Sequence, residues 1–216
     1  MDKQTRTAAL YGEQLSLCAG LAAGLDEVGR GSVAGPLTVA AVVLPAEPRI
    51  QGLNDSKKLT EKQRDALAVE IRYTATAIAL AHVSAAEIDA GGMAAALRQA
   101  FGQALGALRT ADGQPLELDA ILLDGNPLGL HPREISVVKG DGRVACIAAA
   151  SIIAKVTRDA LMVELAEQYP AWQLASNKGY ASPAHIAAIR EHGLTPIHRR
   201  SFCSGFFQEQ IPFADV

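Results

Sequence analysis

Three short apolar runs in this chain each lead into carboxylates, and this pattern constrains the fold more than any other feature. The runs and their acids are residues 21–26 with Asp26 and Glu27, residues 118–123 with Asp124, and residues 134–138 with Asp141. Short apolar runs bounded by Gly, Pro and polar residues are typical of buried β-strands. If these strands are neighbours in one sheet, their ends bring the acids to a single edge.

Helical patterns alternate with the strands. Two further strands are expected over residues 37–44 and 74–83. Thr60 with Gln63, and Ser84 with Glu87, have capping-box spacing, which favours a helix after each. Helices are expected from residue 60 onward and over about 93–108, 143–168 and 183–191. Strands interleaved with helices predict an α/β fold.

Length and composition fit one sizeable hydrophobic core. The chain has 216 residues, of which 49% are hydrophobic and 20% are charged, and a chain of this size can bury most of its apolar surface. We expect residues 1–20 to form a loosely ordered N-terminal arm. Residues 21–216 are expected to form a single domain, with a C-terminal helical segment from about residue 170. The formal charge of −3 gives no overall nucleic-acid signal, since such domains are often strongly basic.

The cysteines indicate a reducing compartment. Cys18, Cys146 and Cys203 are odd in number, far apart and without Cys-x-x-Cys spacing. This arrangement argues against a disulfide framework or a zinc site. Glu13 and Gln14 interrupt any signal-peptide core, and no apolar run approaches the ~18 residues of a membrane span. We therefore expect a cytoplasmic protein.

The segment from Asp26 to Gly31, Asp-Glu-Val-Gly-Arg-Gly, combines two acids with a glycine-rich turn. Side chains alternate along a strand, so only one of Asp26 and Glu27 would normally reach a given site. The glycines allow a sharp bend and leave backbone amides uncovered. Carboxylates that could hold a hard cation, beside amides and Arg30 that could hold phosphate, suggest metal-dependent chemistry on a phosphodiester. The alternative is an ordinary turn with solvated acids.

Crowded acids at one sheet edge would call for a cation. Without one, carboxylates held together repel one another and take up protons. Two divalent ions about 3.5–4 Å apart could activate a water and stabilise the leaving oxygen of a phosphodiester. Oxygen ligands favour Mg²⁺ or Mn²⁺ over zinc, and the choice between the two stays open. Asp159 competes for the fourth position, but we favour a structural role in which it pairs with Lys155, Arg158 or a backbone amide.

Motifs spread from residue 24 to residue 202 resemble those of bacterial ribonuclease HII, the type-2 ribonuclease H. In order they are GLDEVGRG (24–31) with Gly35 and Pro36, LNDSKKLT (53–60), DGN (124–126), KGD (139–141), IAAASIIAKVTRD (147–159), NKGYAS (177–182) with His185, and HRRSF (198–202). One such motif would be weak support. The ordered set covers most of the chain and leaves little room for coincidence.

The resemblance implies an RNase H-like mixed β-sheet flanked by helices, with a C-terminal helical segment. It implies cleavage of the RNA strand of RNA/DNA hybrids and nicking on the 5′ side of ribonucleotides embedded in duplex DNA, leaving 3′-hydroxyl and 5′-phosphate ends. A divalent metal, Mg²⁺ or Mn²⁺, is implied as cofactor. The implied partner is an RNA/DNA hybrid or ribonucleotide-containing duplex DNA, with no membrane, and a monomer is the default expectation.

Matched position by position, the resemblance assigns both catalysis and metal binding to Asp26, Glu27, Asp124 and Asp141. Gly29, Arg30 and Gly31 would read the ribose 2′-hydroxyl, largely through backbone groups, and Tyr180 would pack on the sugar of the next nucleotide. The 2′-hydroxyl is the group that separates RNA from DNA at a site. Backbone amides brought close by glycine can contact it without regard to base identity.

The remaining polar and aromatic candidates have weaker assignments. Ser56, Lys57 and Lys58 are expected to meet backbone phosphates, with Lys178 and Arg199 as lesser candidates. The histidines at 185, 192 and 198 lack a metal-ligand pattern and are interpreted as structural or phosphate-adjacent. Phe206, Phe207 and Phe213 are expected to cover a hydrophobic groove rather than form a flexible partner-binding tail.

Two other classes of function are weighed beside this one. The first is a non-catalytic module that binds RNA/DNA hybrids, and the intact set of acids argues against it. The second is another RNase H-like metal-dependent phosphoesterase, such as a resolvase or an exonuclease. The Gly-Arg-Gly turn argues against that class, because such an enzyme would ignore the 2′-hydroxyl.

Overall fold

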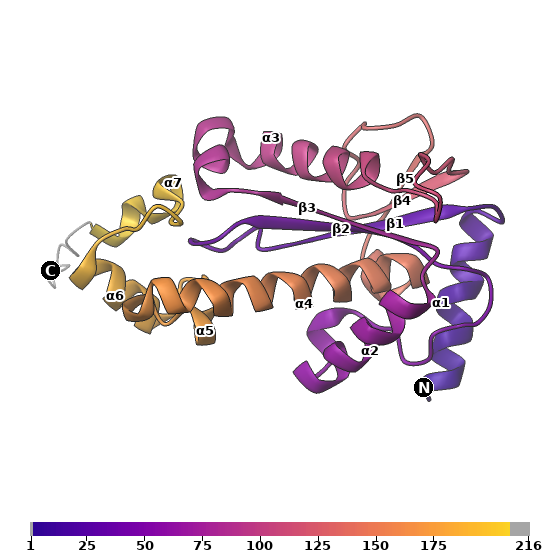
Figure 1. The fold of residues 1–216 in the computed structure, drawn as a ribbon, viewed down its shortest axis with the longest axis horizontal. Helices are drawn as coiled ribbons and strands as arrows, with labels where there is room; N and C mark the ends of the chain where they lie inside the picture. The colour runs from indigo at the N-terminus through magenta and orange to yellow at the C-terminus, as the bar shows by residue number, and fades with distance from the viewer. Residues whose placement is uncertain (1, 208–216) are drawn as a thin grey trace, which may run out of the picture.

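The computed structural model describes residues 2–207, and these contain a five-stranded mixed sheet (Figure 1). The strands are β1 (Ala22–Val28), β2 (Leu37–Val43), β3 (Ala77–Val83), β4 (Ala120–Asp124) and β5 (Glu134–Val137). Their order across the sheet is β3-β2-β1-β4-β5. β1 pairs antiparallel with β2 and parallel with β4, which pairs parallel with β5. The three strands that lead into acids are therefore parallel neighbours, which fulfils the condition under which the sequence predicted that their acids meet.

Helices cover both faces of the sheet (Figure 1). Those of the described residues are α1 (Lys3–Leu17), α2 (Glu61–Thr74), α3 (Ala85–Gly106), α4 (Ala145–Gln168), α5 (Leu174–Asn177), α6 (Pro183–His192) and α7 (Arg200–Cys203). α3 lies on one face, and α4 lies on the other with α1 and α2 beside it. The short helices α5 to α7 lie beyond one end of the sheet. This confirms the α/β fold with a mixed sheet, flanking helices and a C-terminal helical segment.

Alternating side chains divide the core into two layers, one on each face of the sheet. Ala23 and Leu25 of β1 pack on the α3 side, whereas Ala22 packs on the α4 side. Gly24 faces α4, and a Cβ at this position would lie 2.2 Å from the carbonyl carbon of Cys146. Because glycine has no Cβ, the first turn of α4 can rest directly on β1. The turn that precedes α4 is thereby held against the end of the strand.

Helix starts follow the local capping chemistry. The capping boxes that begin at Thr60 and Ser84 are both present. The second box starts a first helical turn of α3 at Ala85, but Gly92 has a non-helical backbone, with φ 77° and ψ 165°, and kinks the helix. The Ala-rich part therefore begins at Met93, as predicted. β3 begins at Ala77 rather than at residue 74, because α2 continues through Thr74.

The N-terminal segment is not the loosely ordered arm that the sequence predicted. Asp2 caps helix α1 by accepting a hydrogen bond from the backbone N–H of Thr5. The side chains of Thr7, Tyr11 and Gln14 then accept hydrogen bonds from the backbone N–H groups of Gly52, Ile50 and Cys146. These partners lie 39 to 132 residues further along the chain, so the contacts were not readable from the local sequence. Gln14 in effect caps the first turn of α4.

The C-terminal aromatic residues divide into a buried and an exposed part. Phe206 packs against Val33, Ile189 and Cys203, as expected of a covering residue. Phe207 is 54% exposed and covers no groove. Phe213 lies outside the described residues. Within residues 2–207, no helix combines the length and the apolar character that crossing a bilayer requires.

Candidate active site

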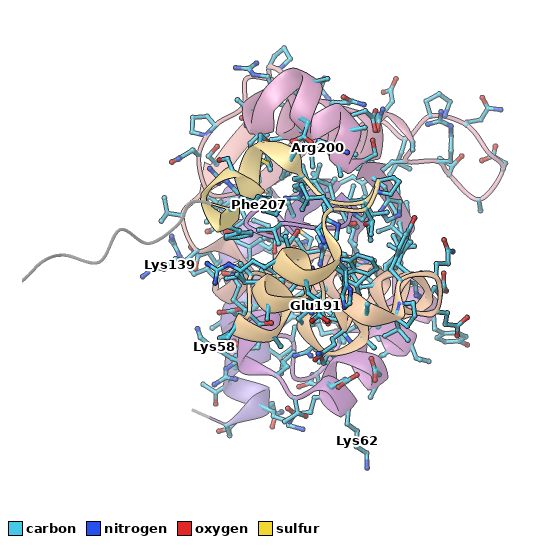
Figure 2. The ribbon with its side chains drawn as sticks, turned by 90° about the vertical axis from the view of Figure 1, so that its left-hand side faces the viewer. Lys58, Lys62, Lys139, Glu191, Arg200 and Phe207 are labelled. Atoms are coloured by element: carbon cyan, nitrogen blue, oxygen red, sulfur yellow. The ribbon has the colours of Figure 1, made fainter. Side chains whose placement is uncertain are left out.

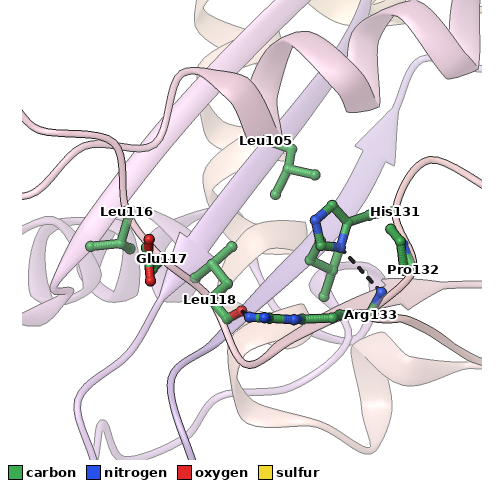
Figure 3. Close-up of a pocket in the computed structure, with 8 residues that line it drawn as sticks. Leu105, Leu116, Glu117, Leu118, His131, Pro132 and Arg133 are labelled. Atoms are coloured by element: carbon green, nitrogen blue, oxygen red, sulfur yellow. Dashed lines mark hydrogen bonds between the residues drawn. The ribbon is translucent and has the colours of Figure 1, made fainter.

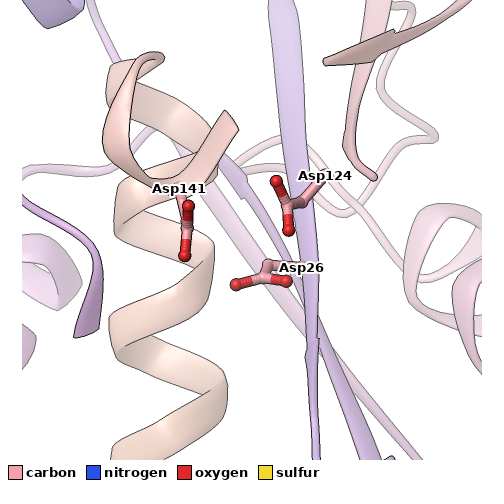
Figure 4. A group of neighbouring side chains, drawn as sticks. All are labelled: Asp26, Asp124 and Asp141. Carbon is pink, nitrogen blue, oxygen red and sulfur yellow. The ribbon is translucent and has the colours of Figure 1, made fainter. Parts of the chain in front are cut away.

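Three of the four predicted acids meet at one edge of the sheet (Figure 4). Asp26 and Asp124 come from the parallel strands β1 and β4, and Asp141 lies in the short 3₁₀ turn that leads into α4. Carboxylate oxygens of the three lie within 4.8 Å of one another. We call Asp26, Asp124 and Asp141 the acid cluster.

The two acids of β1 face opposite sides of the sheet. Asp26 pairs with Ala40, whose side chain lies in the core layer under α4, and Glu27 pairs with Val39, which belongs to the layer under α3. Glu27 stands outside the acid cluster, and its carboxylate lies 3.8 Å from the guanidinium of Arg30. The alternation of side chains along a strand predicted this separation. The role of Glu27 as a metal ligand stays a prediction.

Backbone amides fix the orientation of the cluster. The N–H of Gly140 donates to Asp124 Oδ1 at 2.6 Å, and the N–H of Glu27 donates to Asp26 Oδ1 at 2.7 Å. A Cβ at Gly140 would lie 2.6 Å from the Ile147 side chain and 3.4 Å from Asp124 Oδ1. A larger residue would therefore require the Ile147 side chain to move. Both carboxylates are held with further lone pairs free for other ligands.

Burial and mutual repulsion disfavour the ionised cluster. The pKa of Asp26 is raised well above its ordinary value, first by burial and then by the nearby Glu27 and Asp124 carboxylates. The pKa of Asp141 is also raised, by burial and then by Asp124 and Asp55. A divalent cation among these oxygens would reverse the balance, because it attracts the charged forms. The donor set is all oxygen and fits Mg²⁺ or Mn²⁺.

This electrostatic balance predicts that Mg²⁺ stabilises the fold more strongly as the pH rises. Because the native pKa of Asp26 and Asp141 exceeds the unfolded value of about 4, their stabilising contribution is present below that pH and is lost as the pH rises through the native pKa. Mg²⁺ binds the ionised acids. At 100 times its Kd it should raise Tm by roughly 5–10 °C, and more at about pH 8 than at about pH 5.

Thermal unfolding of the wild-type chain and Asp124→Asn, with and without Mg²⁺, checks this expectation. The variant lacks one carboxylate of the cluster and should lose most of the Mg²⁺-dependent rise in Tm. An equal rise in the variant, or the same rise at both pH values, would show that Mg²⁺ acts elsewhere on the protein.

The turn that follows β1 contains two glycines with different roles. Gly29 has a φ of 86°, and a Cβ at this position would lie 2.3 Å from Nε of Arg158. The fold therefore requires glycine there. At Gly31 no atom lies within 4 Å of where a Cβ would be. The backbone at Gly31 is thus open to a ligand, as the sequence predicted for this turn.

Two buried arginines hold the segment that includes this turn, residues 29–36. Arg158 donates to the carbonyl oxygens of Pro36, Lys178 and Ala34 and to the hydroxyl of Ser32, at 2.8 to 3.0 Å. Arg199 donates to the carbonyl oxygens of Arg30 and Gly35 at 3.0 to 3.2 Å. The prediction of Arg199 as a phosphate ligand was wrong, because its side chain is buried and bonded to the backbone.

Tyr180 lies beside the same segment. Its ring is partly exposed, at 38%, and the guanidinium of Arg158 lies 5.7 Å from the ring centroid. Its carbonyl oxygen is 2.9 Å from Nδ1 of His185, and Nε2 of His185 is 3.1 Å from Nε2 of His198. Since the N–H of Thr195 donates to Nδ1 of His198, the proton of that ring lies on Nε2. These two histidines are structural, and burial lowers the pKa of His198 to about 4.

The predicted phosphate ligands differ in how exposed they are. Lys57 and Lys58 are exposed, whereas Ser56 is buried and its hydroxyl bonds to Ser151 at 2.9 Å. Sequence reasoning missed Asp55, which accepts a hydrogen bond from the N–H of Lys57 and raises the pKa of Asp141. An acid followed two residues later by a turn amide is a common capping pattern, and this was the available signal.

The other lesser candidates have structural partners. Asp159 pairs with Lys155 at 2.8 Å, which confirms its predicted structural role. Lys178 adopts a left-handed backbone conformation with φ 51°, and its ammonium donates to the carbonyl oxygen of Ala175. Neither residue belongs to the acid cluster.

A hollow of about 560 Å³ lies at the opposite end of β4 (Figure 3). It is lined by Leu105, Leu116, Glu117, Leu118, Ile121, His131, Pro132 and Arg133. Arg133 and His131 are engaged in hydrogen bonds with the backbone of the same loops. None of the acid cluster lines this hollow, so the sheet edge remains the candidate active site.

Comparisons with known proteins agree on one family. Residues 23–205 match a family model described as Ribonuclease HII. A ribonuclease HII from Dechloromonas aromatica is 48% identical over 191 residues, which cover 88% of this chain and 94% of the relative. One from Ruegeria sp. is 50% identical over 182 residues, covering 83% and 76%. The crystal structure of ribonuclease H2 from Pyrococcus horikoshii matches with a TM-score of 0.70 at 27% identity, covering 86% of this chain and 96% of that one.

Proposed function

Because the chain belongs to the ribonuclease HII family, we propose that it is a metal-dependent endoribonuclease. It cleaves the RNA strand of RNA/DNA hybrids and nicks duplex DNA on the 5′ side of embedded ribonucleotides. The products carry 3′-hydroxyl and 5′-phosphate ends. The observation that carries this proposal is the acid cluster, in which carboxylates from two parallel strands and the following turn converge within 4.8 Å.

In this proposal Asp26 and Asp124 would provide most of the contacts to divalent ions, with Glu27 and Asp141 as the further ligands. Ions bound there would supply activation of the attacking water and stabilisation of the departing 3′-oxygen. The N–H of Gly140 keeps Asp124 oriented while this happens. Mg²⁺ and Mn²⁺ both suit the oxygen ligands.

Substrate recognition is assigned to the neighbouring turn. Gly29, Arg30 and Gly31 would contact the ribose 2′-hydroxyl, and the exposed ring of Tyr180 would pack on the next sugar. The open backbone at Gly31 supports the first role. Lys57 and Lys58 would meet phosphates, which is supported by their exposure. The hydroxyl of Ser56 is bonded to Ser151, so Ser56 would support the two lysines from the buried side of the turn rather than contact a phosphate through that hydroxyl.

We further propose that the protein is a cytoplasmic monomer. Because α1 is bonded to residues 50, 52 and 146, the single domain is proposed to include α1 as well as the residues from 21 onward. The location is supported by cysteine chemistry: Cys18, Cys146 and Cys203 are free thiols, and free thiols persist in reducing compartments. The monomer is the default expectation.

One assay tests the function against both alternatives. The protein is incubated with Mg²⁺ and a DNA duplex that carries one ribonucleotide, beside an all-DNA duplex of the same sequence. Nicking of the first duplex alone, at its ribonucleotide, is the expected result. Cutting of both duplexes would favour another phosphoesterase, and binding of a hybrid without cutting would favour the non-catalytic module.

A further inference from the structure

Helix α1 contributes two cations to a polar groove beside the active site. The groove has a volume of about 320 Å³ and lies between α1, the segment that follows β2 and the helix α2. Its lining residues are Lys3, Arg6, Gln51, Gly52, Asn54, Lys58, Leu59, Gln63, Ala66, Leu67 and Glu70. Three of them are basic and one is acidic, three carry side-chain amides, and the rest are glycine or apolar. This composition suits an anion with several oxygen acceptors.

The two cations of α1 are not engaged with other parts of the protein. Among residues 2–207, neither Lys3 nor Arg6 lies within 4.0 Å of a carboxylate. The Lys3 side chain passes over Gly52, where a Cβ would lie 3.8 Å from its Cδ. One turn further along α1, Thr7 and Tyr11 are bonded to the backbone at 52 and 50. Lys3 and Arg6 are therefore displayed from a docked helix.

Lys58 joins this groove to the active site. Lys58 is one of the residues that line the groove, while its ammonium lies 3.7 Å from Asp55 and 3.8 Å from where a Cβ at Gly142 would be. Gly142 directly follows Asp141 of the acid cluster. Figure 2 shows Lys58 on the same side of the molecule as Lys139, which precedes that turn. Positive side chains therefore run from the edge of the acid cluster to α1.

We propose that this groove binds backbone phosphates of the duplex that flanks the cleaved nucleotide. The inference rests on the proposed function and extends the substrate footprint to α1, which lies outside the residues that match the family model, 23–205. The groove offers cations and amide donors, with no aromatic side chain among its lining residues. The groove would therefore recognise the charge of the phosphates and would not discriminate between base sequences.

The test compares Lys3→Ala/Arg6→Ala with the wild-type chain on two ribonucleotide-containing duplexes. The second duplex is shortened by about one helical turn (~10 bp) on one side of the ribonucleotide. Two such truncated duplexes are tested, one shortened on each side. Binding is measured by anisotropy in the Asp124→Asn background over a range of salt concentrations, and cleavage is measured in the wild-type background. The matched control for Arg6→Ala is Lys62→Ala, which also removes one positive charge. Lys62 lies on α2 outside the groove, and its side chain points away from Lys58 (Figure 2).

We expect the double variant to bind the longer duplex more weakly, with the slope of log K against log salt reduced by about 1.8. The truncated duplex that lacks the flank bound by the groove should bind the double variant and the wild-type chain equally well. Lys62→Ala should bind every duplex as the wild-type chain does. Equal losses on all duplexes, or no difference from Lys62→Ala, would overturn the inference. If the double variant unfolds, Lys3→Ala alone serves, since Lys3 is exposed. A wild-type chain that does not cleave would instead overturn the proposed function.

Discussion

Replacing Asp124 with Asn is expected to lower the single-turnover rate of cleavage by at least about 10³-fold, while hybrid binding changes little. Asp124 ends β4, the neighbour of β1 in the sheet, and its carboxylate lies within 4.8 Å of those of Asp26 and Asp141. Asn keeps the shape and can still accept the hydrogen bond from Gly140. It removes the charge that holds a divalent ion, whose contribution to phosphodiester cleavage is several kcal/mol. Affinity comes from phosphate contacts and should remain.

A matched control is available in another Asp-Gly turn. Asp112 precedes Gly113 as Asp124 precedes Gly125, but it is exposed and lies in the loop after α3. Asp112→Asn should leave both the rate and the binding at wild-type values. Cleavage is measured on a duplex with one ribonucleotide, and binding on the same duplex by anisotropy. Turnover by Asp124→Asn at the wild-type rate would refute the assignment of this carboxylate.

The acid cluster could be predicted from the sequence because it depends on short-range rules. Apolar runs gave the strands β1 and β4, and the parallel arrangement of neighbouring strands brought Asp26 and Asp124 to one edge. The two-residue period of a strand also indicated that Glu27 would point away from Asp26. Asp141 followed from the next strand and its turn. The local patterns place each acid after a strand, but the pairing of β1 with β4 joins segments about 98 residues apart, and it was a condition of the prediction rather than a result of it.

Contacts between remote segments could not be predicted in the same way. Gln14 bonds to Cys146, 132 residues away, and so turns an apparently loose arm into a docked helix. The sequence makes Arg199 a lesser candidate for a phosphate ligand, but its guanidinium donates to carbonyl oxygens of residues 30 and 35. A lone basic residue in a sequence gives no indication of whether its partner is a phosphate or a buried backbone.

The buried arginines connect the fold to substrate specificity. Neither Arg158 nor Arg199 forms an ion pair within residues 2–207, and both instead satisfy backbone carbonyl oxygens of residues 29–36. A planar guanidinium offers five donors spread over a rigid fork, whereas an ammonium offers only three donors at one atom and cannot reach all four of the separated acceptors of Arg158. The same Arg158 fills the space beside Gly29 and lies against Tyr180. It is thus a positioning residue for both predicted contacts to the ribose.

Replacing Arg158 with Lys should therefore reduce kcat/KM for the ribonucleotide-containing duplex by about 10²-fold at a temperature where the variant is folded. Lys keeps the positive charge but cannot serve all four acceptors of Arg158. Each buried acceptor left unpaired costs about 1–3 kcal/mol. Three such losses total about 3–9 kcal/mol and would lower Tm by roughly 6 °C or more.

The Mg²⁺-dependent rise in Tm separates positioning from general damage. Arg158 contacts residues 32–36 and 178 rather than the acid cluster, so the variant should keep the full rise while it loses cleavage. Arg72→Lys is the matched control, because Arg72 lies on α2 and donates a hydrogen bond to Thr157 at the surface. Wild-type kcat/KM in Arg158→Lys below its Tm would show that the turn keeps its shape without the guanidinium. Loss of the Mg²⁺ response would place the damage in the acid cluster instead.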